Sequence, residues 1–166
     1  MASDIQGRLE QTIAPGDRLL LDASVVISYF SGGDRWAEAA RTVIEDLVKP
    51  GRNPAVVSTL TVMESLVGPM RRVPPGHLTA LDFFANWPNL TVLPIDLAVA
   101  QEGASIRAHD RFATPDALVI GTGVVAGVSW LVTGDGQWRQ RLVQIASHVR
   151  VCYLGGFLEL HQPDRD

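Results

Sequence analysis

Short apolar runs alternate along the chain with longer segments in which apolar residues recur at helical spacing. Each run is four or five residues long, which is typical of a buried strand. The segments between the runs are long enough to lead from one strand to a parallel neighbour. The five predicted strands span residues 18–22, 55–58, 90–93, 129–133 and 149–153.

Predicted helices fill the gaps between the strands. One begins just after residue 22, and the others span 34–48, 59–67, 76–87, 96–109 and 114–126. Pro50-Gly51 and Gly68-Pro69 are expected to end two of them. Asp96 and Thr114 suit N-cap positions, with Pro115 as a first helical residue. Strands that alternate with helices predict an α/β fold, in which a mostly parallel sheet is covered on both faces.

The composition is that of one globular domain. The chain has 166 residues, of which 46% are hydrophobic and 19% charged, and these values exclude a disordered or fibrous protein. We expect a single domain at 17–160, an N-terminal extension at 1–16 and a tail at 161–166. The one cysteine, Cys152, excludes an intrachain disulfide and a cysteine-based zinc site. A reducing cytoplasm is the simplest location.

No segment is predicted to enter a membrane. Residues 1–16 are too polar for a signal peptide. The longest uncharged run, 117–134, is long enough to raise the question of a span, but it contains four glycines and several hydroxyl side chains. We interpret it as a buried helix, a glycine turn and a buried strand.

The net charge of −4 excludes a bulk polycation, so any surface that binds nucleic acid must be local. Lys49 is the only lysine, and the other thirteen basic residues are arginines. Arginine suits planar recognition of phosphate or carboxylate, although a GC-rich genome produces the same bias.

Three aspartates stand at the ends of predicted elements, where each has an ordinary structural explanation. Asp22 follows the first strand and could cap the next helix. Asp116 lies in the first turn of a helix, where an acid interacts favourably with the helix dipole. Asp135 lies in Gly134-Asp135-Gly136, a common turn composition. Taken singly, none of them predicts a site.

Glu64 is harder to explain structurally. Its neighbours one helical turn away, Leu60 and Val67, are apolar, so the carboxylate shares an apolar face. An ionised carboxylate there needs a cation or a strong hydrogen-bond partner. An arginine from elsewhere in the chain would serve, but no basic residue lies within one turn of Glu64.

Together the four acids predict a metal site. Asp22 and Asp135 each end a strand, and ligand crevices of parallel sheets lie at that edge; Asp116 and Glu64 are expected to face the same edge. Two carboxylates about 5 Å apart repel by roughly 3 kcal/mol at an effective dielectric near 20, so such a cluster needs a cation. Oxygen donors without a histidine or cysteine pair suit Mg²⁺ or Mn²⁺. The corresponding chemistry is metal-assisted attack of water on a phosphodiester.

The motifs that carry these acids resemble the PIN-domain nucleases, and most of all the VapC toxins of bacterial toxin–antitoxin pairs. The resemblance covers residues 17–156 and rests on Leu20–Ser24, Ser58–Glu64 followed by Gly68-Pro69, Pro115–Leu118 and Leu131–Asp135. It implies a three-layer α/β/α sandwich with a five-stranded parallel sheet and an acidic pocket holding Mg²⁺ or Mn²⁺. It also implies ribonuclease activity on single strands and neutralisation by a cognate antitoxin.

The resemblance also implies roles for individual residues. Asp22, Glu64, Asp116 and Asp135 occupy the positions of the family's catalytic and metal-binding acids, with Asp22 and Asp116 the firmest metal ligands. Ser24 and Thr133 match hydroxyl positions that hydrogen-bond the metal-bound water or the scissile phosphate. Arg107 resembles a basic position on the helix before the third acid. The chain departs from many relatives at Gln137, where they carry another acid.

Arginines elsewhere are candidates to hold the RNA backbone, although a solvated surface charge is the alternative for each. They are Arg71, Arg72, Arg107, Arg111, Arg139 and Arg141. Trp36, Trp87 and Trp138 are expected in core or dimer contacts, while Trp138 beside Arg139 would also suit base stacking. The apolar helix at 36–48 suits a homodimer or an antitoxin contact.

Two rival functions remain open on the sequence. A haloacid-dehalogenase-like phosphatase would use Asp22 as its nucleophile, but that class needs a second acid two positions on, where this chain has Ser24. A catalytically inactive module that binds RNA or protein would keep the fold, but it would not need all four acids.

Overall fold

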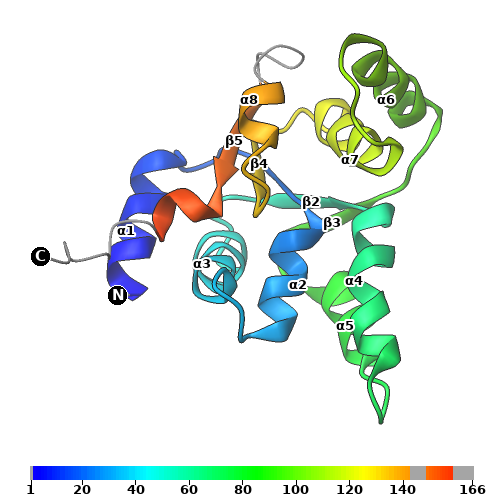
Figure 1. The fold of residues 1–166 in the computed structure, drawn as a ribbon. Helices are drawn as coiled ribbons and strands as arrows, with labels where there is room; N and C mark the ends of the chain where they lie inside the picture. The colour runs from blue at the N-terminus through cyan, green and yellow to red at the C-terminus, as the bar shows by residue number, and fades with distance from the viewer. Residues whose placement is uncertain (1, 143–148, 159–166) are drawn as a thin grey trace, which may run out of the picture.

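The computed structural model describes residues 2–142 and 149–158. One parallel sheet lies at its centre, with the strand order β3-β2-β1-β4-β5 (Figure 1). This confirms the predicted five-stranded parallel sheet. Two strands have the predicted bounds, and the others are shorter by one residue at one or both ends. The strands are β1 (Leu19–Leu21), β2 (Ala55–Ser58), β3 (Leu90–Leu93), β4 (Trp130–Thr133) and β5 (Arg150–Tyr153).

The predicted helices are all present in the described residues, together with two that the pattern did not predict, α1 and α8. The predicted helix at 34–48 is a short α-helix that continues as a π-helical segment, η1. The elements are α1 (Ala2–Thr12), α2 (Ala23–Ser31), α3 (Ala37–Arg41), η1 (Thr42–Val48), α4 (Thr59–Arg71), α5 (His77–Asn86), α6 (Leu97–His109), α7 (Thr114–Val125), α8 (Trp138–Leu142) and the 3-10 turn η2 (Leu154–Phe157).

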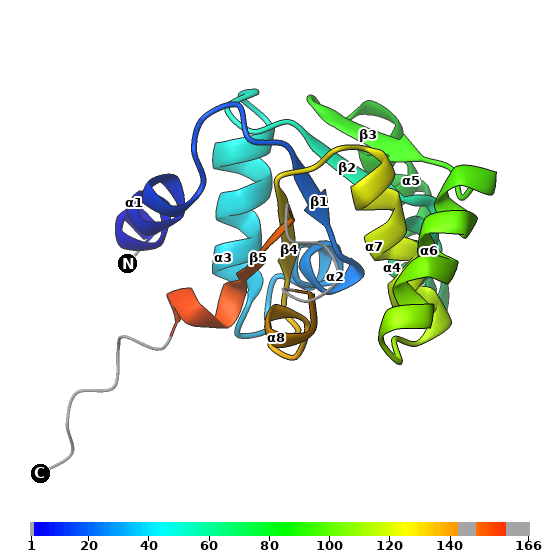
Figure 2. The same cartoon turned by 90° about the horizontal axis from the view of Figure 1, so that it is seen from above.

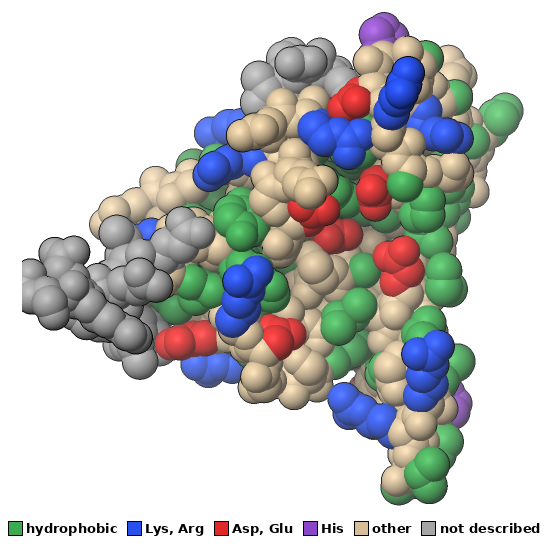
Figure 3. All heavy atoms as spheres, viewed as in Figure 1, with side chains coloured by type: hydrophobic (Ala, Val, Ile, Leu, Met, Phe, Trp, Pro, Cys, Tyr) green, Lys and Arg blue, Asp and Glu red, His purple; other side chains and the backbone are tan. Residues whose placement is uncertain are grey.

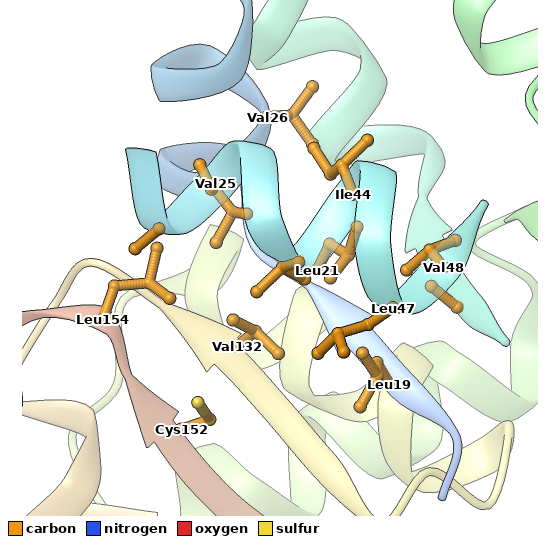
Figure 4. Close-up of a cluster of buried hydrophobic side chains, with 14 of the residues drawn as sticks. Leu19, Leu21, Val25, Val26, Ile44, Leu47, Val48, Val132, Cys152 and Leu154 are labelled. Atoms are coloured by element: carbon orange, nitrogen blue, oxygen red, sulfur yellow. The ribbon is translucent and has the colours of Figure 1, made fainter. Parts of the chain in front are cut away.

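Alternate strand residues supply two separate cores, because successive side chains of a strand point to opposite faces. Leu19 and Leu21 face the core that packs against α1, α2, α3, η1 and α5. Figure 4 shows this core, with Val25 and Ile44 among the helical side chains that meet the sheet. Leu20 faces the other core, against α6, α7 and α8. The chain is therefore a three-layer sandwich, as Figure 2 shows.

The connections between the strands determine where the direction of the strand order reverses. After β1 the chain moves outward through β2 to β3, and then α6 and α7 bring it back to β4 on the other side of β1. The direction of strand order therefore reverses between β1 and β4. In open α/β sheets this reversal opens a crevice at the carboxyl ends of the strands, where ligands bind. Asp22 and Asp135 follow the two strands that flank it.

The uncharged run at 117–134 is a helix, a turn and a strand, as predicted. It comprises most of α7, a turn at Gly127 with φ 65°, and β4. Helix α7 lies close to α6. A Cβ on Gly121 would come within 3.1 Å of the Gly103 nitrogen, so the absence of a side chain at Gly121 allows this approach. Among the described residues, no helix is both long enough and apolar enough to span a membrane.

Two predicted helix ends are wrong. Gly68-Pro69 does not end α4, which runs to Arg71, because Pro69 is buried in the last turn and its carbonyl accepts the Arg72 N–H at 3.4 Å. Thr114 is not an N-cap; Ala113 precedes the helix and the Thr114 hydroxyl accepts a hydrogen bond from Arg107 at 2.9 Å. Asp96 does cap α6, since its side chain accepts from the Val99 N–H at 3.0 Å.

Helix α1 occupies most of the N-terminal extension. Ile5, Leu9 and Ile13 recur at a spacing of four residues, and all three are buried in the core that contains Leu19 and Leu21. The Arg8 guanidinium donates to the carbonyls of Gly156 at 2.7 Å and Phe157 at 2.9 Å. The extension is thus packed against the core of the domain and against η2.

Candidate functional site

Asp22 lies between the last residue of β1 and the first residue of α2, but its side chain does not cap that helix. Instead, its Oδ2 atom accepts hydrogen bonds from the hydroxyls of Ser24 at 2.7 Å and Thr133 at 3.0 Å. The interpretation of Asp22 as a side-chain cap is therefore wrong. Two neutral donors hold one carboxylate oxygen in place, and the other oxygen has no hydrogen-bond partner among the described residues.

The same two hydroxyls connect the β1 end to the loop after β4. Ser24 Oγ accepts the Gly134 N–H at 2.8 Å, and Thr133 Oγ1 accepts the Asp135 N–H at 3.0 Å. The Asp135 carboxylate accepts the Gln137 N–H at 2.9 Å, which is the turn chemistry expected from Gly-Asp-Gly. The loop that carries Asp135 is thereby fixed relative to Asp22.

Glu64 and Asp116 come to the same edge from the two layers of helices. Glu64 lies half-buried in α4, and burial together with the charges of Asp22 and Asp116 raises the pKa of its carboxyl. Asp116 lies half-buried in the first turn of α7, and burial together with the charges of Asp22 and Asp135 raises its pKa as well. The structure therefore brings the four predicted acids into electrostatic contact, with Asp22 acting on both helical carboxylates.

Little positive charge offsets this cluster. None of the ion pairs found within residues 2–142 and 149–158 involves Asp22, Glu64, Asp116 or Asp135. Arg141 lowers the pKa of Asp116 through its charge, but its guanidinium pairs with Asp110 at 3.0 Å and lies 3.8 Å from the centre of the Phe112 ring. Figure 3 shows acidic side chains gathered in the middle of this face, with basic side chains around them.

The donor chemistry of the cluster fits a hard divalent cation. Its side chains offer carboxylate oxygens, and Mg²⁺ typically takes one or two carboxylates while keeping several waters. In the described part of the chain, no three His, Cys, Asp or Glu side chains are arranged so that they could hold a metal ion as they stand. In charge and donor type the four carboxylates suit such an ion, whereas the positions of their side chains do not form a ready site for it.

The predicted RNA-binding arginines have different surroundings. Arg107 ties the loop between α6 and α7, because its guanidinium donates to the Phe112 carbonyl at 3.1 Å and to Thr114. Arg111 and Arg139 are exposed. Arg139 also lines a hollow of about 410 Å³ with Arg8. Sequence alone could not distinguish Arg141, whose charge acts on Asp116, from these three.

Trp138 is not a base-stacking platform. Its side chain is only 3% exposed and packs edge-on against Phe112, with ring centres 6.4 Å apart. This confirms the expected core contact. Arg139, the next residue along the chain, is instead exposed to solvent.

A second concave feature lies away from the acids, between α2, α4 and α5. This hollow, the aromatic pocket, has a volume of about 430 Å³ and is lined by Tyr29, Phe30, Phe83, Trp87 and neighbouring residues. The rings pack against one another, with Phe30 and Phe83 centred 5.2 Å apart. Burial, followed by a hydrogen bond to Glu45, raises the pKa of Tyr29 to about 12, so its hydroxyl stays protonated.

Neutralising Glu64 should stabilise the metal-free protein. The pKa of Glu64 is raised in the folded state. The free energy of unfolding therefore falls as pH rises from the unfolded pKa to the folded pKa of this group, and the loss of stability persists at higher pH. Glu64→Gln should raise Tm at pH 7 by about 1–3 °C, since solvent screening keeps the effect below about 1 kcal/mol.

The measurement is thermal unfolding in chelator between pH 4 and pH 8. The gain from Glu64→Gln should shrink below the ordinary glutamate pKa, where wild type also carries a neutral side chain. Glu102→Gln is the control, because the Glu102 carboxyl lies on α6 outside the cluster. A gain of equal size in the control, or a loss of stability in Glu64→Gln at pH 7, would contradict the mutual repulsion.

Comparison with known proteins agrees with this fold. Residues 19–141 match the model of the PIN domain. A search of curated proteins gave no match. Among solved structures, a toxin–antitoxin complex from Klebsiella pneumoniae is similar with a TM-score of 0.58 and 21% identity, over 79% of this chain and 94% of that one. VapBC2 from Rickettsia felis, bound to a promoter DNA fragment, is similar with a TM-score of 0.63 and 13% identity, over 82% of this chain and 98% of that one.

A third structure is described as a toxin that cleaves the sarcin-ricin loop. It is VapC20 from Mycobacterium tuberculosis, similar with a TM-score of 0.59 and 14% identity, over 72% of this chain and 92% of that one. At these identities the solved structures support the fold, and the family match covers all four acids, from Asp22 to Asp135.

Proposed function

Because the chain belongs to the PIN domain family, we propose that it is a metal-dependent endoribonuclease and the toxin of a VapBC-type pair. The observation that carries this proposal is the cluster of Asp22, Glu64, Asp116 and Asp135. Their charges act on one another at the carboxyl edge of the sheet, and no ion pair of the described residues neutralises any of them. Such a cluster is stabilised by a bound cation.

In this proposal Asp22 and Asp116 would hold a Mg²⁺ or Mn²⁺ ion, and Glu64 and Asp135 would add further carboxylates to the site. A divalent ion at such a site lowers the pKa of a bound water and stabilises the charge that develops on a phosphodiester. Ser24 and Thr133 orient Asp22 by donating to its Oδ2. Their second contacts, to the backbone N–H groups of Gly134 and Asp135, fix the loop after β4 relative to Asp22.

The expected products are a 5′-phosphate and a 3′-hydroxyl, because water attacks phosphorus in line and the 3′ oxygen leaves. This chemistry does not require the 2′-hydroxyl of the substrate. The proposed preference for RNA therefore rests on the family resemblance, and the exposed Arg107, Arg111 and Arg139 are its candidates for contacts with the backbone. Contacts of that kind weaken steeply as salt increases.

The two rival functions fit the site less well. A phosphatase that uses Asp22 as nucleophile would need an acid at position 24, where Ser24 instead donates to Asp22 at 2.7 Å. A module that only binds RNA or protein has no use for Glu64 and Asp116, whose raised pKa values reflect a destabilising arrangement. Such an arrangement is typical of a functional site.

The test is cleavage of a single-stranded RNA oligonucleotide by the purified chain in Mg²⁺, in Mn²⁺ and in EDTA. We expect cleavage in either metal, none in EDTA and recovery after Mg²⁺ is added back, with 5′-phosphate ends on the products. The same oligonucleotide as DNA tests the substrate preference. Cleavage that persists in EDTA, or none on any RNA tested with a correctly folded protein, would overturn the proposal.

We further propose an antitoxin partner, a homodimer and a cytoplasmic location. The partner proposal is supported by the similar solved structures, which include toxin–antitoxin complexes. The aromatic pocket supplies a concave apolar surface that suits an apolar segment of the antitoxin. Its Arg72 and Asp82 add polar groups at the rim that would orient such a segment.

A substitution at the rim of the aromatic pocket should separate antitoxin binding from cleavage. Thr79 is exposed and lines the pocket, so Thr79→Arg places a long charged side chain where the apolar segment would lie. Affinity for the co-expressed product of an adjacent antitoxin gene should fall at least about tenfold, while RNA cleavage stays unchanged. Calorimetry on the purified pair measures the affinity.

Leu78→Arg is the matched control, because Leu78 precedes Thr79 on α5 but is 71% exposed and does not line the pocket. Equal losses of affinity in both variants would place the antitoxin elsewhere. So would full affinity in Thr79→Arg.

A further inference from the structure

One tryptophan packs against a core with part of its side chain and also stands beside the acidic cluster. Trp36 is half-buried, and a Cβ on Gly134 would lie 3.4 Å from its Nε1 and 3.4 Å from Ser24 Oγ. The edge of the indole therefore touches the loop that carries Asp135, next to a hydroxyl that holds Asp22. The other tryptophans differ: Trp130 and Trp138 are buried, and Trp87 lines the aromatic pocket.

Two further side chains extend Trp36 into a small surface, here called the Trp36 platform. The guanidinium carbon of Arg35 lies 4.0 Å from the centre of the indole ring, and Arg35 is exposed. Tyr153 packs edge-on against the indole at 5.7 Å. A Cβ on Gly136 would lie 3.3 Å from Tyr153 Cζ, so glycines on both sides of Asp135 leave room for the two rings.

The loop before α3 holds this arrangement in place. The Trp36 backbone N–H donates to the Asp34 carboxylate at 2.9 Å, and the Ser31 hydroxyl donates to the other oxygen of the same carboxylate at 3.1 Å. In contrast, the Trp36 Nε1–H has no hydrogen-bond partner among the described residues. A donor, an aromatic ring and a stacked cation are thus available within contact distance of the proposed active-site loop.

We propose that the Trp36 platform binds an unpaired nucleobase of the substrate next to the scissile phosphate. The proposal rests on the ribonuclease function and adds to it how the substrate is held. Proteins that bind single-stranded nucleic acid stack bases on aromatic rings and on arginine planes. Arg35 forms the outer layer on which the base stacks. Trp36 holds the planar guanidinium in position through the cation–π contact, and Tyr153 packs against the edge of the indole.

This placement also explains why the cation lies over Trp36. A base that stacks there leaves its phosphate close to the acids, whose negative charge repels it. The Arg35 charge offsets part of this repulsion in the substrate complex. Arg35 and Trp36 are thus substrate-positioning residues, and their contribution should appear in KM more than in kcat.

The experiment is a double-mutant cycle between the protein and the RNA. A single-stranded RNA with one mapped cleavage site is made with an abasic residue at each position around that site in turn. In wild type, one abasic position should raise KM about tenfold, the size expected for one lost stacking contact. In Trp36→Leu and Arg35→Gln, KM for intact RNA should already be raised to a similar degree, and the same abasic residue should add little.

Lys49→Gln is the matched control, because the Lys49 ammonium lies 5.2 Å from the ring centre of Trp87, a similar pair away from the acids. It should leave KM and the abasic penalty unchanged. Trp36→Phe should recover most of the affinity, and Arg35→Gln removes an exposed side chain, so at least one variant folds normally. An abasic penalty of the same size in wild type and both platform variants overturns the platform.

The outcomes separate the platform from the enzyme. If wild type cleaves RNA in a metal-dependent way but the cycle shows no coupling, the platform is wrong and the ribonuclease stands. If no RNA is cleaved by wild type, the ribonuclease is wrong and the platform falls with it. If Trp36→Leu instead loses antitoxin binding while keeping its KM, the surface binds protein and the platform proposal is overturned.

Discussion

Asp22→Asn should reduce RNA cleavage by about a thousandfold or more while the protein stays folded. Asp22 is the one acid whose charge acts on both Glu64 and Asp116, so it lies at the centre of the proposed metal site. Electrostatic stabilisation by a bound metal is worth several kcal/mol, and each 1.36 kcal/mol is a factor of ten in rate. Asparagine removes the negative charge and presents an amide N–H₂ or a weaker oxygen donor in its place.

The measurement is the initial rate on a single-stranded RNA in saturating Mg²⁺, together with thermal unfolding in chelator. Tm should stay the same or rise, because the substitution removes carboxylate repulsion. Asp46→Asn is the control, since Asp46 is exposed on η1 and its charge is not among those that act on Glu64 or Asp116. An Asp22→Asn protein that folds normally and keeps more than a tenth of the wild-type rate would rule out Asp22 as a metal ligand.

Ser24→Ala should raise the Mg²⁺ concentration needed for half-maximal cleavage by about 10- to 100-fold. Ser24 Oγ donates to Asp22 and accepts from the Gly134 N–H, so it orients a proposed ligand and holds the loop that carries another. Removing a group that orients a metal ligand typically costs that much in metal affinity or activity. The substitution also leaves the Gly134 N–H without its acceptor, which should lower the stability of the fold by about 1 kcal/mol.

A Mg²⁺ titration of the cleavage rate distinguishes orientation from a structural loss. Ser24 acts through Asp22, so excess Mg²⁺ should recover most of the rate in Ser24→Ala, and Ser24→Thr, which retains the hydroxyl, should recover part of the affinity. Ser105→Ala on the exposed face of α6 is the control. A reduced rate at every Mg²⁺ concentration, with an unchanged midpoint, would show that Ser24 does not orient a metal ligand.

Much of the fold follows from patterns within short stretches of the chain. The apolar runs that became β1, β2 and β4 are buried throughout, and the two edge strands β3 and β5 are partly buried. Asp96 caps α6 as expected, because a cap depends only on neighbouring residues. The two wrong helix ends, at Pro69 and Thr114, were decided by contacts from elsewhere: burial of the proline ring, and the guanidinium of Arg107, which took the Thr114 hydroxyl.

For the site, the sequence by itself determined that Asp22 and Asp135 follow strands, that Asp116 begins a helix and that Glu64 shares an apolar helix face. These four were therefore the candidates. Only the tertiary structure decided that Asp22 accepts from Ser24 and Thr133 rather than capping its helix, that Arg141 is the arginine near Asp116, and that Trp36 rather than Trp138 borders the Asp135 loop. Spacing along the chain fixes an element and its local neighbours, whereas the partner of a side chain depends on which elements the sheet order brings together.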